Sequence, residues 1–379
     1  MIRIAHIQLL PLLSGVQRVC LDELQRLDPE KFERYLICSN PGPLTEAAEK
    51  AGIKCLYIKT LKREISVSDD LRALKDLISL FRKFKFDIVH THSSKPGVLG
   101  RVAAFLCRVK LIIHTVHGFS FPIARNKIEY CLFYLMEKIG CMCGDLLICL
   151  HERDKNIAIN KLGVNSDSIY ILKNAVDSEK FRQLSQEQKI YLKKKFRLTE
   201  NSIIIGMIGR LWPQKNPQTL LKAFKIFADK QTHVHLCFIG DGELKSTLEH
   251  TSVLNGLSDR VHFFGWQENT ELFLNTFDIF VLPSLWEGMP LAILEAQSTS
   301  LPCIVSDIPG NNHLIKEGIN GFLFPTNNAT YLADRLVYLI THPKERQFLG
   351  EVSRKIIERD YNVNVRIALL TNIYEKHLS

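Results

Sequence analysis

The stretch IIIGMIGRLWPQKNPQTLLKAFKIFA, residues 203–228, decides the fold class of this chain. Residues 203–208 are almost entirely apolar, which is typical of a short strand covered on both faces of a parallel sheet. Gly209 follows the strand, and residues 220–228 have the apolar spacing of a helix. A strand, a glycine turn and an amphipathic helix in this order predict one unit of a parallel sheet flanked by helices.

The same alternation continues in both directions along the chain. A polar, Lys-rich stretch at 174–198 separates two such series, so we predict an α/β protein with Rossmann-like domains at 1–175 and 176–379, facing one another across a deep cleft. The last helix, about 362–378, is a candidate for packing back on the N-terminal domain. Helix 68–84 is predicted in the first half, and strands are predicted at 2–7, 86–90, 111–116, 145–150, 169–172, 235–239, 261–264, 279–282 and 303–306.

The net charge is +9 and is unevenly distributed. Residues 1–177 hold 26 Lys and Arg against 19 Asp and Glu, giving +7, and residues 178–379 hold 23 against 21, giving +2. A basic half attracts a phosphate-bearing substrate, an acidic membrane face or nucleic acid, although a solvated basic face explains it equally well. The ten cysteines show no paired framework, and a reducing cytosol fits best. We expect six of them to be small core side chains, because they lie in apolar runs: Cys20, Cys38, Cys107, Cys149, Cys237 and Cys303.

No segment has the length and composition of a membrane span. The N-terminus lacks the apolar core of a signal peptide, and the apolar stretch 128–150 contains Glu129, Glu137, Lys138 and Asp145. We therefore expect a cytoplasmic protein with at most peripheral contact with an anionic membrane. The basic and apolar sequence FRKFKF, residues 81–86, is a candidate for that contact, although the end of an amphipathic helix accounts for it more simply.

Two cations follow the strand at 203–208. Arg210 comes directly after Gly209, and Lys215 lies five residues further on. A glycine at the end of a strand lets a ligand approach the backbone. A guanidinium offers a planar fork and an ammonium a point charge, which together suit a pyrophosphate. Two ordinary surface cations before a helix would give the same pattern.

The segment SLWEGMPLAILEA, residues 284–296, carries two carboxylates. Pro290 suits the first turn of a helix, whose N-terminus favours an anionic or polyhydroxylated ligand. Glu287 precedes that helix and Glu295 lies within it, eight residues later, so we expect both roughly on one face. One would then hold a sugar hydroxyl and the other a ribose. Two solvated glutamates are the alternative, which the apolar neighbours weaken.

Several histidines gather in the first half. His90 and His92 alternate in a strand, so their side chains share a face, and His114 lies nearby. A metal site is one interpretation, but no third ligand is evident and no Asp-x-Asp ends a strand, so we predict no catalytic metal. His117 follows another strand, where a histidine is more often structural.

Four motifs occur in a fixed order: GRLWPQKN (209–216), IGDGEL (239–244), FFGW (263–266) and EGMPLAILE (287–295). With them the chain resembles the retaining glycosyltransferases of family 4, which have the double-Rossmann GT-B fold; the last motif fits the Glu-x7-Glu signature of that family. Less specific matches are SGVQR (14–18), DIVHTHSSKPGVLGR (87–101) and HTVHGFSF (114–121). The resemblance covers nearly the whole chain and is strongest to the transferases of bacterial surface polysaccharides.

The resemblance implies a role for each matching residue. Arg210 and Lys215 would bind the donor diphosphate and stabilise the leaving group, and Glu295 would accept the ribose hydroxyls. Glu287 would contact the transferred sugar, and His117 would face it near the anomeric carbon. The other implied donor contacts are Gly15, Gly209, Gly265, Gly288, Met289, Pro290 and Leu291.

The resemblance also implies the reaction. A sugar moves with retention from a nucleotide sugar, a UDP-sugar ahead of a GDP-sugar, to a lipid-diphosphate-linked saccharide of O-antigen or lipopolysaccharide type. The nucleotide sugar is a co-substrate, so no cofactor is expected, and no nucleic-acid partner. The alternatives are a nucleotide-sugar epimerase of the same fold and a non-catalytic sugar-nucleotide-binding protein. One departure is Ala175, where the family often has glycine; a positive φ there would cost about 1 kcal/mol.

Overall fold

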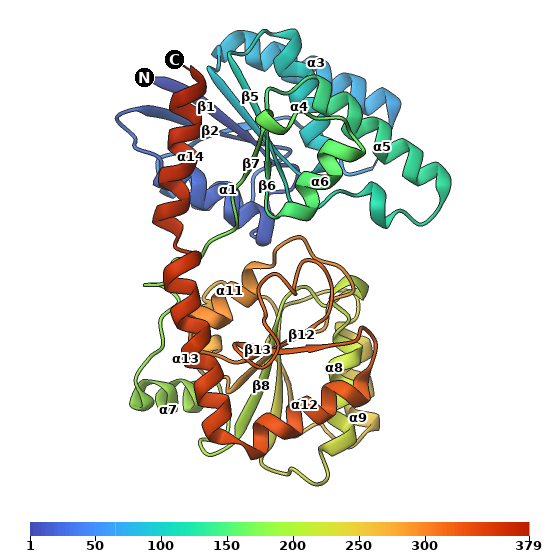
Figure 1. Ribbon diagram of the computed structural model, residues 1–379, viewed down its shortest axis with the longest axis vertical. Coiled ribbons are helices and arrows are strands. Elements are labelled where there is room, and N and C mark those ends of the chain that lie inside the picture. Colours follow the sequence, from blue (N-terminus) through green and yellow to red (C-terminus); the bar gives the residue numbers. More distant parts are fainter. Residues whose placement is uncertain (65, 379) are drawn as a thin grey trace. The chain divides into compact units, whose positions relative to one another are not determined.

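The computed structural model describes residues 1–64 and 66–378, which form two compact units (Figure 1). The N-terminal unit consists of Met1–Asn174 together with Asn364–Ser379, and the C-terminal unit is Ala175–Val363. The last helix, α14 (Val363–Leu378), therefore lies almost wholly in the N-terminal unit, although it is the end of the chain.

The N-terminal unit is built on a seven-stranded parallel sheet. The strand order is β3-β2-β1-β4-β5-β6-β7, so β1 is an interior strand, with β2 and β3 added on one side of it and β4 to β7 on the other. Such an order requires a crossover between successive parallel strands, and helices provide it. The strands are β1 (Ile2–Ile7), β2 (Phe32–Cys38), β3 (Lys54–Tyr57), β4 (Ile88–His92), β5 (Leu111–Val116), β6 (Leu146–Cys149) and β7 (Ile169–Ile171).

Helices cover both faces of this sheet (Figure 1). On one face α1, α2 and α14 bury residues such as Leu24, Leu44 and Ile373, and on the other α3 and α4 bury residues such as Leu77 and Ala104. Near β5 and β6, α5 and α6 form a further small core. The helices are α1 (Gly15–Arg26), α2 (Pro43–Lys50), α3 (Val67–Phe84), α4 (Ser94–Leu106), α5 (Lys127–Met142) and α6 (Glu152–Asn160).

The C-terminal unit repeats this architecture with six parallel strands in the order β10-β9-β8-β11-β12-β13. The strands are β8 (Ile203–Ile208), β9 (Val234–Ile239), β10 (Val261–Phe263), β11 (Ile279–Leu282), β12 (Cys303–Ser306) and β13 (Gly321–Phe324). The helices are α7 (Gln186–Lys195), α8 (Pro217–Phe227), α9 (Lys245–Leu254), α10 (Thr270–Leu274), α11 (Leu291–Ser298), α12 (Ala329–Thr341) and α13 (Pro343–Asp360). The predicted fold class, two Rossmann-like sheets, is confirmed.

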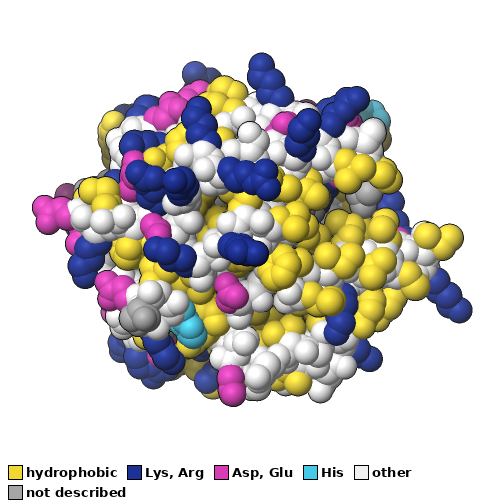
Figure 2. Space-filling model, turned by 90° about the horizontal axis from the view of Figure 1, so that it is seen from above, with side chains coloured by type: hydrophobic (Ala, Val, Ile, Leu, Met, Phe, Trp, Pro, Cys, Tyr) yellow, Lys and Arg dark blue, Asp and Glu magenta, His cyan; other side chains and the backbone are white. Residues whose placement is uncertain are grey.

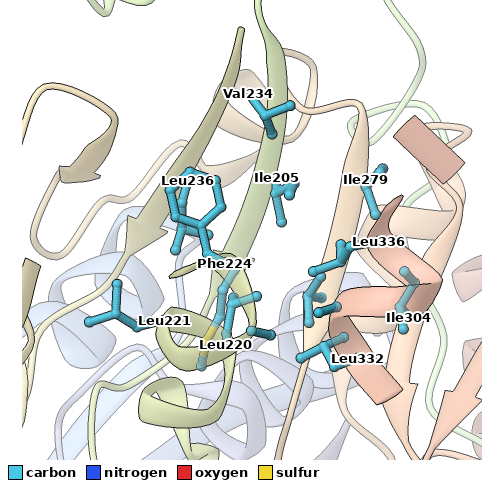
Figure 3. Packing of buried hydrophobic residues seen from close by; sticks show 14 of the residues in the cluster. Ile205, Leu220, Leu221, Phe224, Val234, Leu236, Ile279, Ile304, Leu332 and Leu336 are labelled. Atoms are coloured by element: carbon cyan, nitrogen blue, oxygen red, sulfur yellow. The ribbon is translucent and has the colours of Figure 1, made fainter. Parts of the chain in front are cut away.

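The main core of the C-terminal unit is made of hydrocarbon side chains. Phe224 of α8 and Leu336 of α12 pack against Ile205, Leu236 and their neighbours on the sheet (Figure 3). All of these residues are fully buried. Fully burying a side chain of this size stabilises a fold by roughly 1.5–3 kcal/mol, so this layer holds the strand ends in place.

The predicted elements agree with the structure, with small shifts. Strand β4 begins at Ile88 rather than at residue 86, because Lys85 ends α3 in a left-handed conformation (φ 51°) and Asp87 then pairs with Arg3 at the start of β1. Strands β2, β3 and β13 were not predicted. Edge strand β3 is half exposed and β2 carries Glu33 and Arg34, so neither shows a continuous apolar run.

The structure bears on four expectations about particular segments. Helix α3 ends at Phe84 within FRKFKF, and Phe81 and Phe86 are buried, so the aromatic residues of this segment do not face solvent together. Ala175 is not among the residues with positive φ, so the turn carries no such strain. Five of the six cysteines expected in the core are buried, and Cys107 is partly buried. None of the described helices is long and apolar enough to cross a bilayer.

Candidate active site

Backbone segments approach one another closely where the strands of the C-terminal unit end. Gly240, after β9, has φ 137°, and a Cβ atom there would lie 2.0 Å from the carbonyl oxygen of Gly209, after β8. Its N–H donates to the carbonyl of Gly265 over 2.7 Å. Only glycine fits such contacts without a shift of the backbone. The three loops therefore form one surface at the carboxyl edge of the sheet, where ligands bind in folds of this kind.

Lys215 and Glu287 meet at this edge. Lys215 ends the short 3₁₀ turn before α8, and its Nζ lies 2.5 Å from Oε1 of Glu287. The hydroxyl of Ser284 donates to the same carboxylate oxygen over 2.6 Å. The lysine side chain is 17% exposed and that of Glu287 8% exposed. The pair is thus held in place yet remains accessible from solvent, as a ligand-binding pair must be.

The loop that carries Glu287 is fastened to the loop that carries Lys215. Gln214 accepts a hydrogen bond from the backbone N–H of Leu285 over 2.8 Å, and its amide donates to the carbonyl of Trp286 over 2.9 Å. Sequence reasoning missed Ser284 and Gln214 as supporting residues. The signal that could have found them is their position within the two segments already singled out, 209–216 and 284–296.

Arg210 lies beside the pair in sequence but has a different environment. Its side chain is exposed, and its guanidinium stacks on the ring of Trp212 at 3.8 Å. Stacking on an indole fixes the plane of a guanidinium while leaving its N–H groups available at the edge. The edge of the Arg210 guanidinium can therefore donate hydrogen bonds to an anionic group.

Glu295 and Glu287 occupy different kinds of structure. Glu295 lies inside α11 and is 6% exposed, whereas Glu287 lies in the loop before the helix. The eight-residue spacing consequently does not place Glu287 on a helical face, as we had expected; its position is set by Lys215 and Ser284. Pro290 immediately precedes α11, where it was predicted, and Met289 is buried beside it.

In the N-terminal unit, His117 follows β5 and begins a chain of hydrogen-bonded side chains. Its Nε2 lies 3.1 Å from Nδ1 of His92, and Nε2 of His92 lies 3.0 Å from Nδ1 of His6. The hydroxyl of Tyr374, from α14, lies 3.3 Å from Nε2 of His6 and 2.6 Å from Nδ1 of His90. The predicted site residue is thus linked to the last helix through buried histidines.

An ion pair lies at the centre of this network. Nη2 of Arg366, also from α14, lies 2.7 Å from Oε1 of Glu23, and both side chains are almost completely buried. Oε2 of Glu23 is 3.6 Å from both His6 and His92. Burial, and secondarily the charge of Arg366, lower the pKa of His6 to about 3, so His6 is neutral at physiological pH.

The described residues contain one group with the geometry of a metal site, in which ligand atoms of His6, Glu23, His90 and His92 lie within 4.8 Å of one another. However, Arg366 neutralises the carboxylate, and both ring nitrogens of His90 contact hydroxyl groups. A divalent ion would add charge to a buried site that is already neutral, which is unfavourable. The absence of a catalytic metal stays a prediction.

The last predicted site residue, Gly15, begins α1. A Cβ atom at this position would have no other atom within 4 Å, so there is open space on the side of the backbone where a side chain would point. The structure thus places Gly15 and His117 in the N-terminal unit and the remaining predicted residues in the C-terminal unit.

Two family models match this chain. One, described as Glycosyltransferase Family 4, matches residues 13–180, and the other, Glycosyl transferases group 1, matches residues 188–356. A relative from Escherichia coli, UDP-Gal:alpha-D-GlcNAc-diphosphoundecaprenol alpha-1,3-galactosyltransferase, is 42% identical over 98% of this chain and 96% of its own. The chain belongs to glycosyltransferase family 4.

Further relatives of this family 4 enzyme fit the same assignment. The capsular polysaccharide biosynthesis glycosyltransferase CapM of Staphylococcus aureus is 27% identical over 85% of each chain. Among solved structures, Anabaena Alr3699/HepE in complex with UDP and glucose matches with a TM-score of 0.86 at 16% identity, covering 99% of this chain and 100% of that one. That likeness confirms the GT-B fold, and the family confirms that the protein is a glycosyltransferase.

Proposed function

We propose that this family 4 glycosyltransferase transfers galactose from UDP-galactose to N-acetylglucosamine on a diphosphoundecaprenol carrier, in an α-1,3 linkage and with retention. The observation that carries this proposal is the 42% identity to the Escherichia coli enzyme of that description, sustained over 98% of this chain. The site of the C-terminal unit supports it, because its charges suit a sugar diphosphate.

The donor contacts follow from the charges at the strand ends. The diphosphate would displace the Glu287 carboxylate from Lys215 and accept hydrogen bonds from the free edge of the stacked Arg210 guanidinium. Glu287, still oriented by Ser284, would then accept hydroxyl groups of the sugar together with the backbone of residues 288–291. Glu295 would accept the ribose hydroxyls, and the loop around Gly265 would lie beside the base.

The chemistry needs stabilisation of a leaving group. The bond between the anomeric carbon and the β-phosphate oxygen breaks, and a bond to the acceptor oxygen forms while the acceptor proton passes to the departing phosphate. Negative charge grows on that phosphate, so fixed positive charge beside it lowers the barrier. Lys215 and Arg210 supply this charge. Gly15 and His117 complete the proposed site, with His117 near the transferred sugar.

The proposed acceptor sets the place of the reaction. A saccharide on an undecaprenol carrier is held by a membrane, so we place the reaction at the cytoplasmic face of the membrane, with peripheral contact between the protein and anionic lipid. The net charge of +7 over residues 1–177 favours such contact.

A donor and acceptor panel tests the reaction. Purified protein is incubated with UDP-galactose, UDP-glucose or GDP-mannose and a short-chain N-acetylglucosamine diphosphate lipid. The products are separated by chromatography that resolves epimeric sugar nucleotides, and the lipid products are identified by mass. We expect a hexose to be added only from UDP-galactose. Incubation with UDP-galactose alone is the control. An epimerised sugar nucleotide there would favour an epimerase, and binding without turnover on any acceptor would favour a non-catalytic protein.

A further inference from the structure

Helix α5 carries an apolar stripe that faces solvent. Ile128, Leu132, Leu135, Ile139 and Met142 follow one another at spacings of four and three residues, which places them on one face of the helix. Their exposed fractions are 83%, 41%, 56%, 41% and 73%. Apolar side chains exposed singly are ordinary, but a continuous stripe of five along a helix of 16 residues indicates an interaction surface.

The stripe is not needed to attach α5 to the rest of the unit. The opposite face does so: Glu137 forms an ion pair with Arg101 of α4 over 3.1 Å, and both side chains are almost fully buried. Phe133 and Tyr134 pack against the small core beside β5 and β6. The helix is therefore anchored by one face while the other remains uncovered.

The apolar stripe lies in the most basic part of the chain. Residues 67–142, which span α3 to α5, contain 12 Lys and Arg against 6 Asp and Glu, so they carry +6 of the total of +9. Four of those acidic residues are already in ion pairs. Exposed cations such as Arg108, Arg125 and Lys127 are left without an equivalent number of anions.

The surface view agrees with this distribution. Figure 2 shows hydrophobic side chains gathered toward the right, the side on which Figure 1 draws α5, with Lys and Arg side chains over much of the remaining face. At the end of α4, which packs on α5 through Arg101, the side chains of Phe105 and Leu106 are also exposed. The combination of apolar stripe and positive surround matches a lipid–water interface.

We propose that the outer face of α5 docks on the surface of an anionic bilayer. The five side chains of the stripe enter the boundary between head groups and acyl chains, and the surrounding cations meet lipid phosphates. This inference rests on the proposed lipid-linked acceptor, and it replaces the segment FRKFKF as the apolar part of the contact, because Phe81 and Phe86 are buried.

A second copy of the chain is the other possible occupant, since spacings of four and three residues also suit a helix pair. An isologous contact would bring two faces of the same positive charge together, which is unfavourable at moderate ionic strength. A bilayer of anionic lipid instead neutralises them. Charge therefore favours the membrane as the partner.

Vesicle flotation with a matched control tests the proposal. The double variant Ile128→Asp/Leu135→Asp removes two exposed residues of the stripe. The control Leu369→Asp changes a leucine on α14, which covers the other face of the sheet; Leu369 is 50% exposed, close to the 56% of Leu135. With vesicles of phosphatidylcholine and phosphatidylglycerol at low salt, we expect wild type and Leu369→Asp to float. We expect the double variant to partition at least about tenfold less, because two side chains are no longer transferred from water.

The outcomes separate this inference from the proposed reaction. The double variant should keep its turnover of a water-soluble acceptor and lose turnover of an acceptor embedded in vesicles. Unchanged flotation of the double variant would overturn the docking surface, and so would a wild-type dimer, in sedimentation, that becomes a monomer in the double variant without any change in lipid binding. Failure of wild type to use any soluble acceptor would overturn the proposed function alone, because flotation needs no turnover.

Discussion

Two ion pairs, one in each unit, show how the same chemistry can serve different ends. Glu23 and Arg366 are separated by 2.7 Å, with exposed fractions of 0% and 6%, and lie within a ring of histidines. Lys215 and Glu287 are separated by 2.5 Å, but the lysine is 17% exposed and the pair lies at the strand ends. The first pair is enclosed on all sides, and the second has one side open.

Enclosure decides what each pair can do. A fully buried charge has only its partner for stabilisation, so losing the partner leaves an uncompensated charge and the pair is structural. A partly open pair can exchange its partner for a ligand, because the ligand charge and water replace the lost contact. We therefore expect changes in the N-terminal pair to affect stability and changes in the C-terminal pair to affect activity.

The largest expected effect is that of acid on the N-terminal unit. Five histidines there have a pKa lowered by burial, so their neutral form is favoured in the folded state: His6, His90, His92 and His114, which are buried, and His117, which is partly buried. Below the unfolded pKa of about 6.5 these histidines take up protons in the unfolded state but stay neutral in the folded state. The free energy of unfolding therefore falls by about 1 kcal/mol for each histidine between pH 6.5 and 5.5.

Glu23 and Asp154 act in the opposite direction, because burial raises their pKa, that of Asp154 to about 6. They offset part of this loss in the free energy of unfolding.

All three tryptophans, Trp212, Trp266 and Trp286, lie in the C-terminal unit, so their fluorescence monitors that unit and circular dichroism monitors both. Acidification to pH 5 should change circular dichroism before fluorescence. Coincident transitions would contradict the contrast between the units.

The second largest effect is expected from removing Arg366, the cation of the fully buried pair. Arg366→Met leaves Glu23 buried without its partner, and we expect the free energy of unfolding to fall by about 3–5 kcal/mol in urea denaturation. The double variant Glu23→Gln/Arg366→Met removes both charges and should recover much of this loss. If the single variant is as stable as wild type, the pair has no structural role.

Removal of Lys215, the cation of the partly exposed pair, should lower turnover. Lys215→Ala takes away a charge beside the departing phosphate, and we expect kcat/KM to fall by about 10²–10³, while unfolding in urea changes little. Lys222→Ala, an exposed lysine of α8, is the control and should transfer sugar at the wild-type rate. Equal activity of the two variants would refute the assignment of Lys215 to the donor site.

The smallest effect concerns the hydroxyl that joins α14 to the histidines. Tyr374→Phe leaves His90 and His6 without that partner and should lower the free energy of unfolding by about 1–2 kcal/mol. Tyr331→Phe removes a hydroxyl that bonds Arg335 nearer the surface of the C-terminal unit, and its effect should be smaller. If Tyr331→Phe lowered the free energy of unfolding more than Tyr374→Phe, this prediction would be wrong.

Much of this arrangement could be predicted from the sequence. Central parallel strands such as β8 and β11 are continuous apolar runs, because both faces of the sheet are covered, so their bounds were found without shifts. Of the predicted site residues that follow them, the structure brings Lys215 and Glu287 together, because both lie after strand ends at one edge of the sheet. The role of these residues and of Arg210 in donor binding stays a prediction. Strand β3 was missed because it is largely exposed and has no continuous apolar run, whereas the edge strands β7 and β10 were predicted from their apolar residues. Strand β13 is apolar and largely buried, so edge position does not explain why it was missed.

By itself, the sequence determined the fold class and the ordered motifs, and it gave the candidate residues of the C-terminal site, because these depend on periodicity and on residues close together in the chain. Tertiary structure alone decided that Tyr374 contacts His90, 284 residues away, that Arg366 neutralises Glu23, and that the stripe on α5 remains uncovered. The physical reason is that burial and charge pairing depend on which distant segments meet, and local patterns carry no record of those partners.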